Sequence, residues 1–394
     1  MLNVGLTASE LRLYHRDLAT SHEVRYSINI LDTAHRPKGG NVASMLLDGQ
    51  IDGEVIRLNR LDNPFADFDD PCILHTLTMT LLDPGYTLGF DSALPSDSAL
   101  YLDRMISVVQ SDYSPSLGRW VDCPIFCGPV SDLTRNDDIV TVTAQSKEAL
   151  AADQINQTVT FHSLKVVDII RNLLARTGET SARMSIPAFA AKSAKDVPVV
   201  RESRAWAKAF WLSESLGQHL MYDGRGVVKM QGAAPPVFTF DGTNILEFPS
   251  HSYGTSEVVN VVRVVVGGGA GQKPKIDVTV PLPYSHPNSA KKLGRNGSLR
   301  NRLLTIEDDT YTTRAGAVNR AKAELKSRQA TDSGTSFTAL PVPGLELWDY
   351  VYVKHDGQVA KQQVTAFTKP LTVEGVMTVG QTQMVQRPIR RTRA

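Results

Sequence analysis

The chain has 394 residues, of which 42% are hydrophobic and 21% are charged, as expected for a folded protein of roughly two to four domains. Its 42 Lys and Arg residues balance 41 Asp and Glu residues. The formal charge of +1 argues against a broad surface for nucleic acid or an anionic membrane. Cys72, Cys123 and Cys127 form no disulfide framework, which fits assembly in a reducing cytoplasm. We expect no signal peptide and no membrane span, because no apolar run approaches the required length.

The first 150 residues alternate between apolar and polar side chains with a period of two. The pattern is clearest in Glu23–Ile30, Leu77–Leu81 and Val140–Ala144. Such alternation is typical of antiparallel strands with one buried face and one face towards water or a partner. Turn sequences such as Asp83-Pro84-Gly85 separate the strands. This region is therefore predicted to form a β-barrel or a β-sandwich.

Helical spacing appears in the middle of the chain. Ser163 is a suitable N-cap for a helix that Gly178 ends, and a second helix is predicted from about Ser203 to Met221. The turn residues Asp223–Gly226 then predict a β-hairpin. We expect a mixed α/β region here.

The last part of the chain returns to strands. Val258–Val266 is a nearly continuous apolar strand, expected to be buried on both faces, and the basic segment Pro281–Arg302 is expected to be an extended surface loop. A helix is predicted over Tyr311–Ala330. The strands predicted after it are Thr335–Val342, Trp348–Val353, Gln363–Phe367 and Leu371–Val379. Together they predict a second small barrel.

We find no sequence motif typical of a catalytic, metal-binding or phosphate-binding site. The nine histidines show no zinc-ligand spacing, and Cys123 and Cys127 are best interpreted as small buried hydrophobes. The loop Gly267–Gly271 lacks the Lys-Ser or Lys-Thr ending of a phosphate-binding loop. We therefore predict no catalytic residues, no cofactor and no metal site.

Aromatic and basic residues near the end are the candidate contacts with partners. Trp348, Tyr350 and Tyr352 alternate along one predicted strand, as the aromatic residues of a sugar-binding platform would, but we prefer to interpret them as barrel core or subunit interface. The C-terminal segment is a short basic tail. The predicted partner-interface residues are Trp348, Tyr350, Tyr352, Arg387, Arg390, Arg391 and Arg393.

This order of strands and turns resembles that of bacteriophage tail hub proteins, both the baseplate hub of contractile tails and the minor tail protein of long non-contractile tails. At the front the resemblance is carried by Ile28–Asp32, Leu77–Pro84 and Arg119–Val130, which leads into Asp138–Ala144. At the back it is carried by Val258–Val266, Ala315–Leu325, Pro343-Gly344, Asp349–Val353 and Gly375–Met377.

The resemblance implies an α+β, mainly β fold with two tube-type antiparallel β-barrel domains and a mixed α/β outer domain. The first barrel is expected at residues 1–155. The outer domain is expected at residues 156–245 and 275–334, the second barrel at 246–274 and 335–380, and the basic tail at 381–394.

The resemblance also implies a homotrimer whose six barrels form a pseudo-sixfold ring at the tail tip of the virion. Such a ring joins the tail tube or distal tail protein to the threefold tip or fibre proteins, contacts the tape measure protein and encloses the DNA channel. We predict a neutral or acidic bore, with Lys291–Arg302 and the arginine-rich tail outside it, against partner proteins. The chain ends within about 20 residues of the last strand, so no cell-wall-cleaving domain is expected.

Two other functions remain open from the sequence alone. One is a carbohydrate-binding, receptor-binding tail component with a β-sandwich fold that uses Trp348, Tyr350 and Tyr352. The other is an enzyme with paired carboxylates that are distant in the chain.

Overall fold

The structure is a computed structural model. It describes residues 4–20, 22–55, 74–89, 98–102, 104–152, 158–162, 164–190, 197–199, 204–253, 259–267, 274–286, 288–307, 311, 313–329, 333–355, 357–380 and 383–384.

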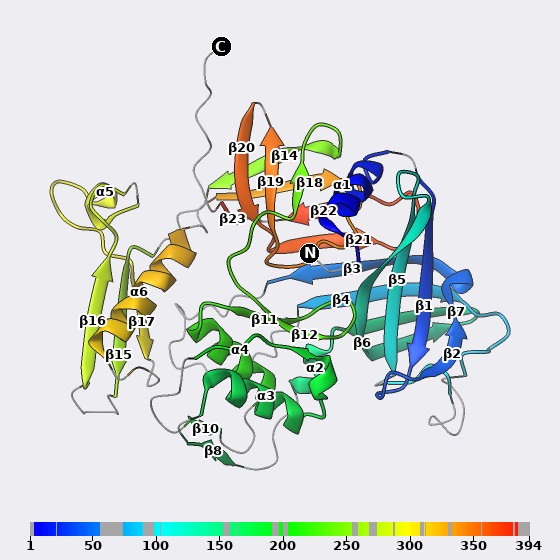
Figure 1. Cartoon of the computed structure of the whole chain (residues 1–394), viewed down its shortest axis with the longest axis horizontal. Coiled ribbons are helices and arrows are strands. Elements are labelled where there is room, and N and C mark those ends of the chain that lie inside the picture. The colour runs from blue at the N-terminus through cyan, green and yellow to red at the C-terminus, as the bar shows by residue number, and fades with distance from the viewer. Residues whose placement is uncertain are drawn as a thin grey trace.

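A continuous sheet of eleven strands dominates the fold and confirms its mainly β character (Figure 1). From one edge to the other its strands are β14 (Ile245–Tyr253), β18 (Ser333–Ala339), β22 (Met377–Gly380), β21 (Ala366–Pro370), β3 (Leu46–Glu54), β4 (His75–Leu82), β7 (Ile139–Gln145), β6 (Arg119–Asn136), β5 (Met105–Ser114), β1 (Val24–Leu31) and β2 (Pro37–Asn41). The pairs within this sheet are antiparallel.

Strands from the first part and the last part of the chain meet within this sheet, where β3 pairs with β21. Four strands from the second half of the chain, β14-β18-β22-β21, thus continue into four from the first half, β3-β4-β7-β6. The 18-residue strand β6 then leaves this layer, because its first part pairs with β5 and its last part with β7. Each set of four strands is backed by a second layer.

The second layer behind the first set consists of β5, β1, β2 and the first part of β6. The layer behind the other set is a separate sheet with the order β13 (Phe238–Phe240), β19 (Tyr350–His355), β20 (Gln358–Gln363) and β23 (Gln383–Met384). A short helix, α1 (Ala8–Asp17), lies beside β5, and the turn η1 (Ala43–Met45) links β2 to β3.

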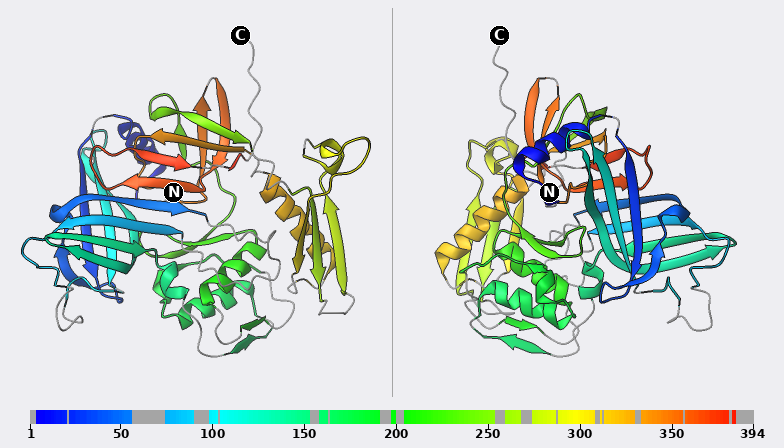
Figure 2. Two further views of the ribbon diagram at one scale, coloured as in Figure 1. Left: turned by 180° about the vertical axis from the view of Figure 1, so that it is seen from behind. Right: turned by 45° about the vertical axis from the view of Figure 1, so that its right-hand side comes forward.

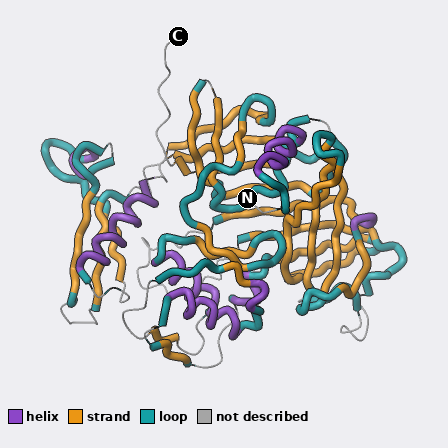
Figure 3. Tube along the Cα trace, in the orientation of Figure 1, coloured by secondary structure: helices purple, strands orange, loops and turns teal. Residues whose placement is uncertain are grey.

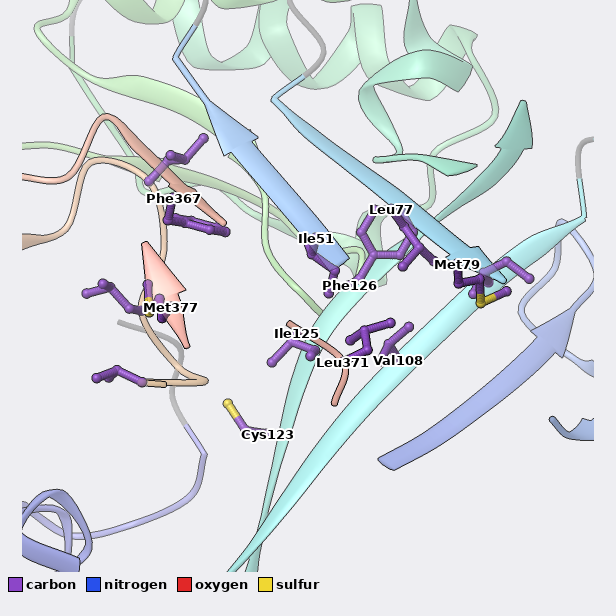
Figure 4. Packing of buried hydrophobic residues seen from close by; sticks show 14 of the residues in the cluster. Ile51, Leu77, Met79, Val108, Cys123, Ile125, Phe126, Phe367, Leu371 and Met377 are labelled. Atoms are coloured by element: carbon purple, nitrogen blue, oxygen red, sulfur yellow. The ribbon is translucent and has the colours of Figure 1, made fainter. Parts of the chain in front are cut away.

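One hydrophobic core fills the space between these layers. Leu77 and Met79 of β4 are fully buried, as are Ile51 of β3 and Met377 of β22. Figure 4 shows side chains from the first and last parts of the chain packed into the same cluster, Phe367 and Leu371 among them. Burial of each such side chain contributes about 1.5–3 kcal/mol, so the two halves stabilise each other.

No ring of paired strands closes within the described part of the chain, since β2 pairs only with β1 and β14 only with β18. The two closed barrels predicted from the sequence are therefore not confirmed. Pro37, Gly39 and Gly40 in β2 favour a short edge strand, because proline and glycine are poor residues for a paired strand interior.

The middle of the chain forms the predicted α/β region. Its helices are α2 (Glu148–Ala151), α3 (Val166–Arg176), η3 (Ser181–Arg183) and α4 (Ala205–Ser215), and its strands are β8 (Val159–Phe161), β9 (Met184–Ser185), β10 (Val197–Val199), β11 (His219–Tyr222) and β12 (Val228–Gln231). The tube trace shows these helices gathered below the large sheet (Figure 3).

The two predicted helices exist, with different ends. The N-cap of α3 is Lys165, while Ser163 lies outside the described residues. Gly178, with a φ of 91°, follows the end of the helix as expected. The second helix stops at Ser215, and His219–Tyr222 forms strand β11 instead of a last helical turn. The predicted turn at Asp223–Gly226 joins β11 to β12.

A separate small unit contains β15 (Val261–Val266), β16 (Ile276–Pro281), β17 (Leu303–Glu307), α5 (Ala290–Leu293) and α6 (Arg314–Gln329). We expected Val258–Val266 in the second barrel, and this assignment is wrong for the described part, because β15 pairs with β16 and β17. Val262, Val264 and Val266 pack against α6, which explains the apolar run. Figures 1 and 2 show this unit standing apart from the large sheet.

Candidate functional site

The most extensive polar feature of the fold is the outward face of the eight strands from β14 to the last part of β6. Along β4, Leu77, Met79 and Leu81 are buried in the core, while Thr76, Thr78 and Thr80 between them point outwards. The same alternation runs through β7, β21 and β22. We call this outward surface the threonine face.

Its hydroxyl residues are Thr76, Thr78, Thr80, Thr134, Thr141, Thr143, Ser336, Thr338, Thr368 and Thr378. Its acidic and amide residues are Asp48, Gln50, Asp52, Glu54, Asp132, Asn136, Gln145 and Glu247. Its apolar and small residues include Leu82, Ile139, Ala366, Pro370 and Gly380, and Leu47 and Leu246 are exposed at irregular positions of β3 and β14.

Strand register lines these residues up across the sheet. One row runs Glu247, Thr338, Thr378, Thr368, Asp52, Thr76 and Gln145, each directly opposite the next. A neighbouring row runs Pro370, Gln50, Thr78, Thr143 and Asp132. Because directly opposed side chains on one face are close neighbours, each row is a continuous polar strip.

Hydrogen bonds within the rows fix several of these side chains. The Thr368 hydroxyl donates to Asp52 Oδ1 at 2.7 Å, and Gln50 Nε2 donates to Asp52 Oδ2 at 2.8 Å. At the other end of the row, the Thr338 hydroxyl donates to Glu247 Oε2 at 2.8 Å. The hydroxyl donors thus face carboxylates of the same surface.

The charge of the threonine face has a single sign. Asp48, Asp52, Glu54, Asp132 and Glu247 are acidic, and no outward position on these eight strands, as far as the structure describes them, holds Lys or Arg. The two basic residues within this region, Arg135 and Lys369, belong to the opposite side of the strands. Arg135 forms an ion pair with Asp83, and Lys369 donates hydrogen bonds to main-chain carbonyls.

Lys369 anchors the inner side of β21. Its Nζ donates to the Pro343 carbonyl at 2.8 Å and to the Leu345 carbonyl at 2.5 Å, and burial lowers its pKa to about 8. Nearby, Glu346 forms an ion pair with Lys229 of β12. Burial opposes ionisation of Glu346, but the ammonium groups of Lys229, the N-terminus and Lys369 together hold the pKa of Glu346 below its usual value. These contacts join the α/β region to the strands that carry the face.

The sequence-predicted interface residues do not form one surface. Trp348 is 3% exposed, lies before β19 with a φ of 61°, and stacks on the His219 ring at a centroid distance of 4.9 Å. Tyr350 is buried as well, whereas Tyr352 is 38% exposed. The aromatic sugar platform therefore has one accessible ring. Arg387, Arg390, Arg391 and Arg393 lie outside the described residues.

The two central cysteines are buried side chains of the core region, as predicted. Burial raises the pKa of the Cys123 thiol to about 12 and that of Cys127 to about 11, so both thiols stay protonated at neutral pH. Within the described ranges, no cluster of three or more His, Cys, Asp or Glu residues is arranged to hold a metal ion. None of the helices that the structure describes combines the length and apolar character needed to cross a bilayer.

Sequence reasoning found the threonine strands but missed the face that they build. The alternation of Thr78 and Thr80, and of Thr141 and Thr143, was visible as an exposed pattern. Local sequence patterns do not predict the pairing of β3 with β21, because it connects residues more than 300 positions apart. Asp52 meets Thr368 only through that pairing, and Glu247 meets Thr338 through the pairing of β14 with β18.

Solved structures of prophage and other tail proteins are similar to this chain in fold. The chain aligns with the tail protein from Neisseria meningitidis MC58 with a TM-score of 0.59 and 14% identity, over 91% of this chain and 96% of that one. It aligns with the 43 kDa tail protein of prophage MuSo2 from Shewanella oneidensis with a TM-score of 0.60 and 12% identity, over 92% and 99%.

A third similar structure is the prophage tail protein gp18 from Listeria monocytogenes EGD-e. Its TM-score is 0.52 at 13% identity, over 90% of this chain and 94% of that one. No family model and no curated protein sequence matches the chain. The likeness therefore lies in the fold.

Proposed function

We propose that this protein is a structural, non-catalytic component of a bacteriophage or prophage tail, and that its threonine face lines the channel through which DNA passes. The fold shared with three tail proteins over 90% or more of the chain supports the tail role. The single observation that carries the channel role is an eight-strand polar face with acidic residues and, at the outward positions that the structure describes, no Lys or Arg.

The chemistry of this face suits the passage of duplex DNA. Proteins hold DNA chiefly through Lys and Arg contacts to phosphates, each of which releases counterions and strengthens binding. Asp48, Asp52 and Asp132 repel phosphates instead, and the Thr368 hydroxyl already donates to Asp52. DNA would therefore move past this surface without a site that retains it. This is the neutral or acidic bore predicted from the sequence.

The arrangement of the strands suggests how the channel is assembled. Each chain contributes two neighbouring sets of four strands, and each set has a backing layer. We take these as the two tube-type units, residues 1–155 and the strands of 237–253 and 333–384. A homotrimer then presents six similar units around one axis. Such a ring matches a sixfold tail tube or distal tail protein on one side and a threefold tip or fibre on the other.

In this proposal the protein lies at the tail tip of the virion, and the tape measure protein and DNA occupy the channel. DNA is a passing cargo and not a bound ligand. The α/β region of residues 158–231 lies outside the tube units, where it is available to other tail proteins.

The test introduces cations into one row of the face. We would prepare the Gln50→Lys/Thr143→Lys variant and a control, Thr33→Lys/Ala175→Lys, whose exposed positions lie off the face. After negative-stain microscopy confirms ring-shaped assemblies, retention of duplex DNA is measured at several salt concentrations. Only the face variant is expected to retain DNA, and retention should fall steeply with salt. Equal DNA retention by the face variant and the control would contradict the channel role.

A further inference from the structure

The small unit of residues 259–329 has a charge that differs sharply from the rest of the chain. It contains 13 Lys and Arg residues and 5 Asp and Glu residues, a formal charge of +8. Because the whole chain carries +1, the remaining residues carry −7, although they include the four arginines of the C-terminal tail. The nearly neutral protein is thus a basic unit attached to an acidic body.

This unit has a hydrophobic core of its own. Val262 and Val264 of β15 pack with Leu304 of β17 and with Ala317 and Ala321 of α6. Three views show the unit projecting to one side of the molecule, beyond the α/β region (Figures 1 and 2). A contact with the α/β region runs through α6, where the Arg320 guanidinium donates to the Glu214 carbonyl at 3.5 Å.

The far end of the unit carries four exposed cations. We define the basic tip as Tyr284, Lys291, Lys292, Arg295, Leu299 and Arg300, all of which are exposed. Tyr284 and Leu299 are 55% and 49% exposed, and the Lys291 ammonium lies 5.8 Å from the Tyr284 ring centroid. Tyrosine and arginine are enriched among the residues that become buried in protein interfaces.

Hydrogen bonds give the tip a defined shape, in contrast to the extended loop predicted from the sequence. The buried Asn260 side chain donates to the Arg300 carbonyl at 2.9 Å and accepts from the Arg302 N–H at 2.7 Å. The Arg300 N–H donates to the Ala290 carbonyl at 2.9 Å, and the Ser289 hydroxyl caps α5. A tip that is ordered before binding loses little entropy when it docks.

Two of the cations lower on the unit are paired with carboxylates of the unit itself. Arg263 donates to Asp277 at 2.9 Å across β15 and β16, and Arg320 lies 3.3 Å from Glu324 along α6. These carboxylates are on the strands and the helix and not at the tip. The four cations of the tip lie on one ordered, exposed segment, which suits them to an external acidic surface.

We propose that the basic tip docks on the acidic body of a second copy of this chain, so that neighbouring copies are held together at the rim of the assembly. Charge complementarity between the +8 unit and the −7 remainder identifies the occupant. Tyr284 and Leu299 supply the apolar contact, and Lys291, Lys292, Arg295 and Arg300 supply orientation and attraction. This interface rests on the proposed ring assembly and adds to it a peripheral contact between copies.

The experiment compares self-association of the full chain with that of two quadruple variants by sedimentation velocity. The tip variant is Lys291→Glu/Lys292→Glu/Arg295→Glu/Arg300→Glu. The matched control, Arg12→Glu/Lys38→Glu/Lys165→Glu/Lys354→Glu, makes the same change of charge at exposed positions of the body. A third variant, Tyr284→Ala/Leu299→Ala, removes the apolar contact without altering charge. Circular dichroism and thermal unfolding check that each variant is folded.

We expect the tip variant to weaken association by roughly tenfold or more and to abolish most of its salt dependence, whereas the control associates at least as well as the wild type. The apolar variant should weaken association and keep the salt dependence. Rings that form equally well with the tip variant would overturn the docking inference and leave the proposed function intact. Wild-type chains that stay monomeric would overturn both.

Binding of duplex DNA by the wild type that disappears in the tip variant would also overturn the inference, because it would make nucleic acid the occupant of the tip. The DNA-retention measurement on the variants of the threonine face would still test the proposed channel role by itself.

Discussion

Thr368 and Asp52 lie directly opposite each other across the β21–β3 pair, and the Thr368 hydroxyl donates a 2.7 Å hydrogen bond to the Asp52 carboxylate. One residue comes from the last thirty positions of the chain and the other from the first sixty. Their contact lies at the seam where the two sets of four strands become one sheet. The threonine face is continuous because this seam is closed.

Replacing Thr368 by valine tests the contribution of the seam. Valine keeps the shape and the strand preference of threonine but removes the donor to Asp52. We expect a loss of about 0.5–1.5 kcal/mol in the free energy of unfolding, measured by chemical denaturation. The control is Thr378→Val, one strand away on the same face and more exposed, for which the loss should be smaller. Equal effects at the two positions would contradict a specific role for the Thr368 hydrogen bond.

The Lys229–Glu346 ion pair should matter more than any single contact on the face. Lys229→Met alone leaves the buried Glu346 carboxylate without its cation, and we expect a loss of about 3–5 kcal/mol in unfolding free energy. The double variant Lys229→Met/Glu346→Leu removes both charges and should be less destabilised than the single variant. A double-mutant cycle measures the coupling, and additive losses would show that the two residues act independently.

Stability should depend on pH through Glu148, which is fully buried in α2. Burial raises its pKa to about 7 from an ordinary value of 4.5, so between these pH values the folded state holds a proton that the unfolded state has released. The contribution of Glu148 to stability is therefore present at low pH and is lost as pH rises from 4.5 to 7. This loss is up to roughly 3 kcal/mol.

The variant Glu148→Gln cannot ionise and isolates this effect. The unfolding free energy of the variant relative to the wild type should rise across pH 4.5 to 7 and become constant above that range. Urea unfolding at a series of pH values provides the measurement. A difference that does not change with pH would mean that Glu148 ionises normally in the folded protein.

Gly128 is a position in strand β6 where there is no space for a side chain. A Cβ at this residue would overlap the Gln145 carbonyl, which is main chain and cannot move aside. Gly128→Ala should therefore cost about 3 kcal/mol or more, or prevent folding. Gly40→Ala is the control, because a Cβ there meets no atom within 4 Å, and its effect on thermal unfolding should be small.

Much of this fold follows from local sequence. The alternation in residues 77–81 and 140–144 predicted strands β4 and β7, and the Asp223–Gly226 turn predicted the β11–β12 hairpin. Trp348 was placed in a strand because aromatic residues alternate there. Its positive φ breaks the extended backbone, so the strand begins at Tyr350.

Other features depend on contacts that no local pattern records. The apolar run of β15 fits a strand in any buried sheet, and only its pairing with β16 and β17 assigns it to the small unit. The basic segment Pro281–Arg302 is polar enough to suggest a loop, but its order comes from Asn260, twenty positions or more away. The threonine face likewise requires the long-range pairing of Asp52 with Thr368.

The most direct test of the central claim is a cryo-electron microscopy reconstruction of the assembled protein. We predict a ring of copies around an axial channel whose wall is formed by the threonine face, with Thr78, Thr143 and Asp52 directed into the lumen. A reconstruction in which this face lies on the outside, or is covered by another subunit, would contradict the claim.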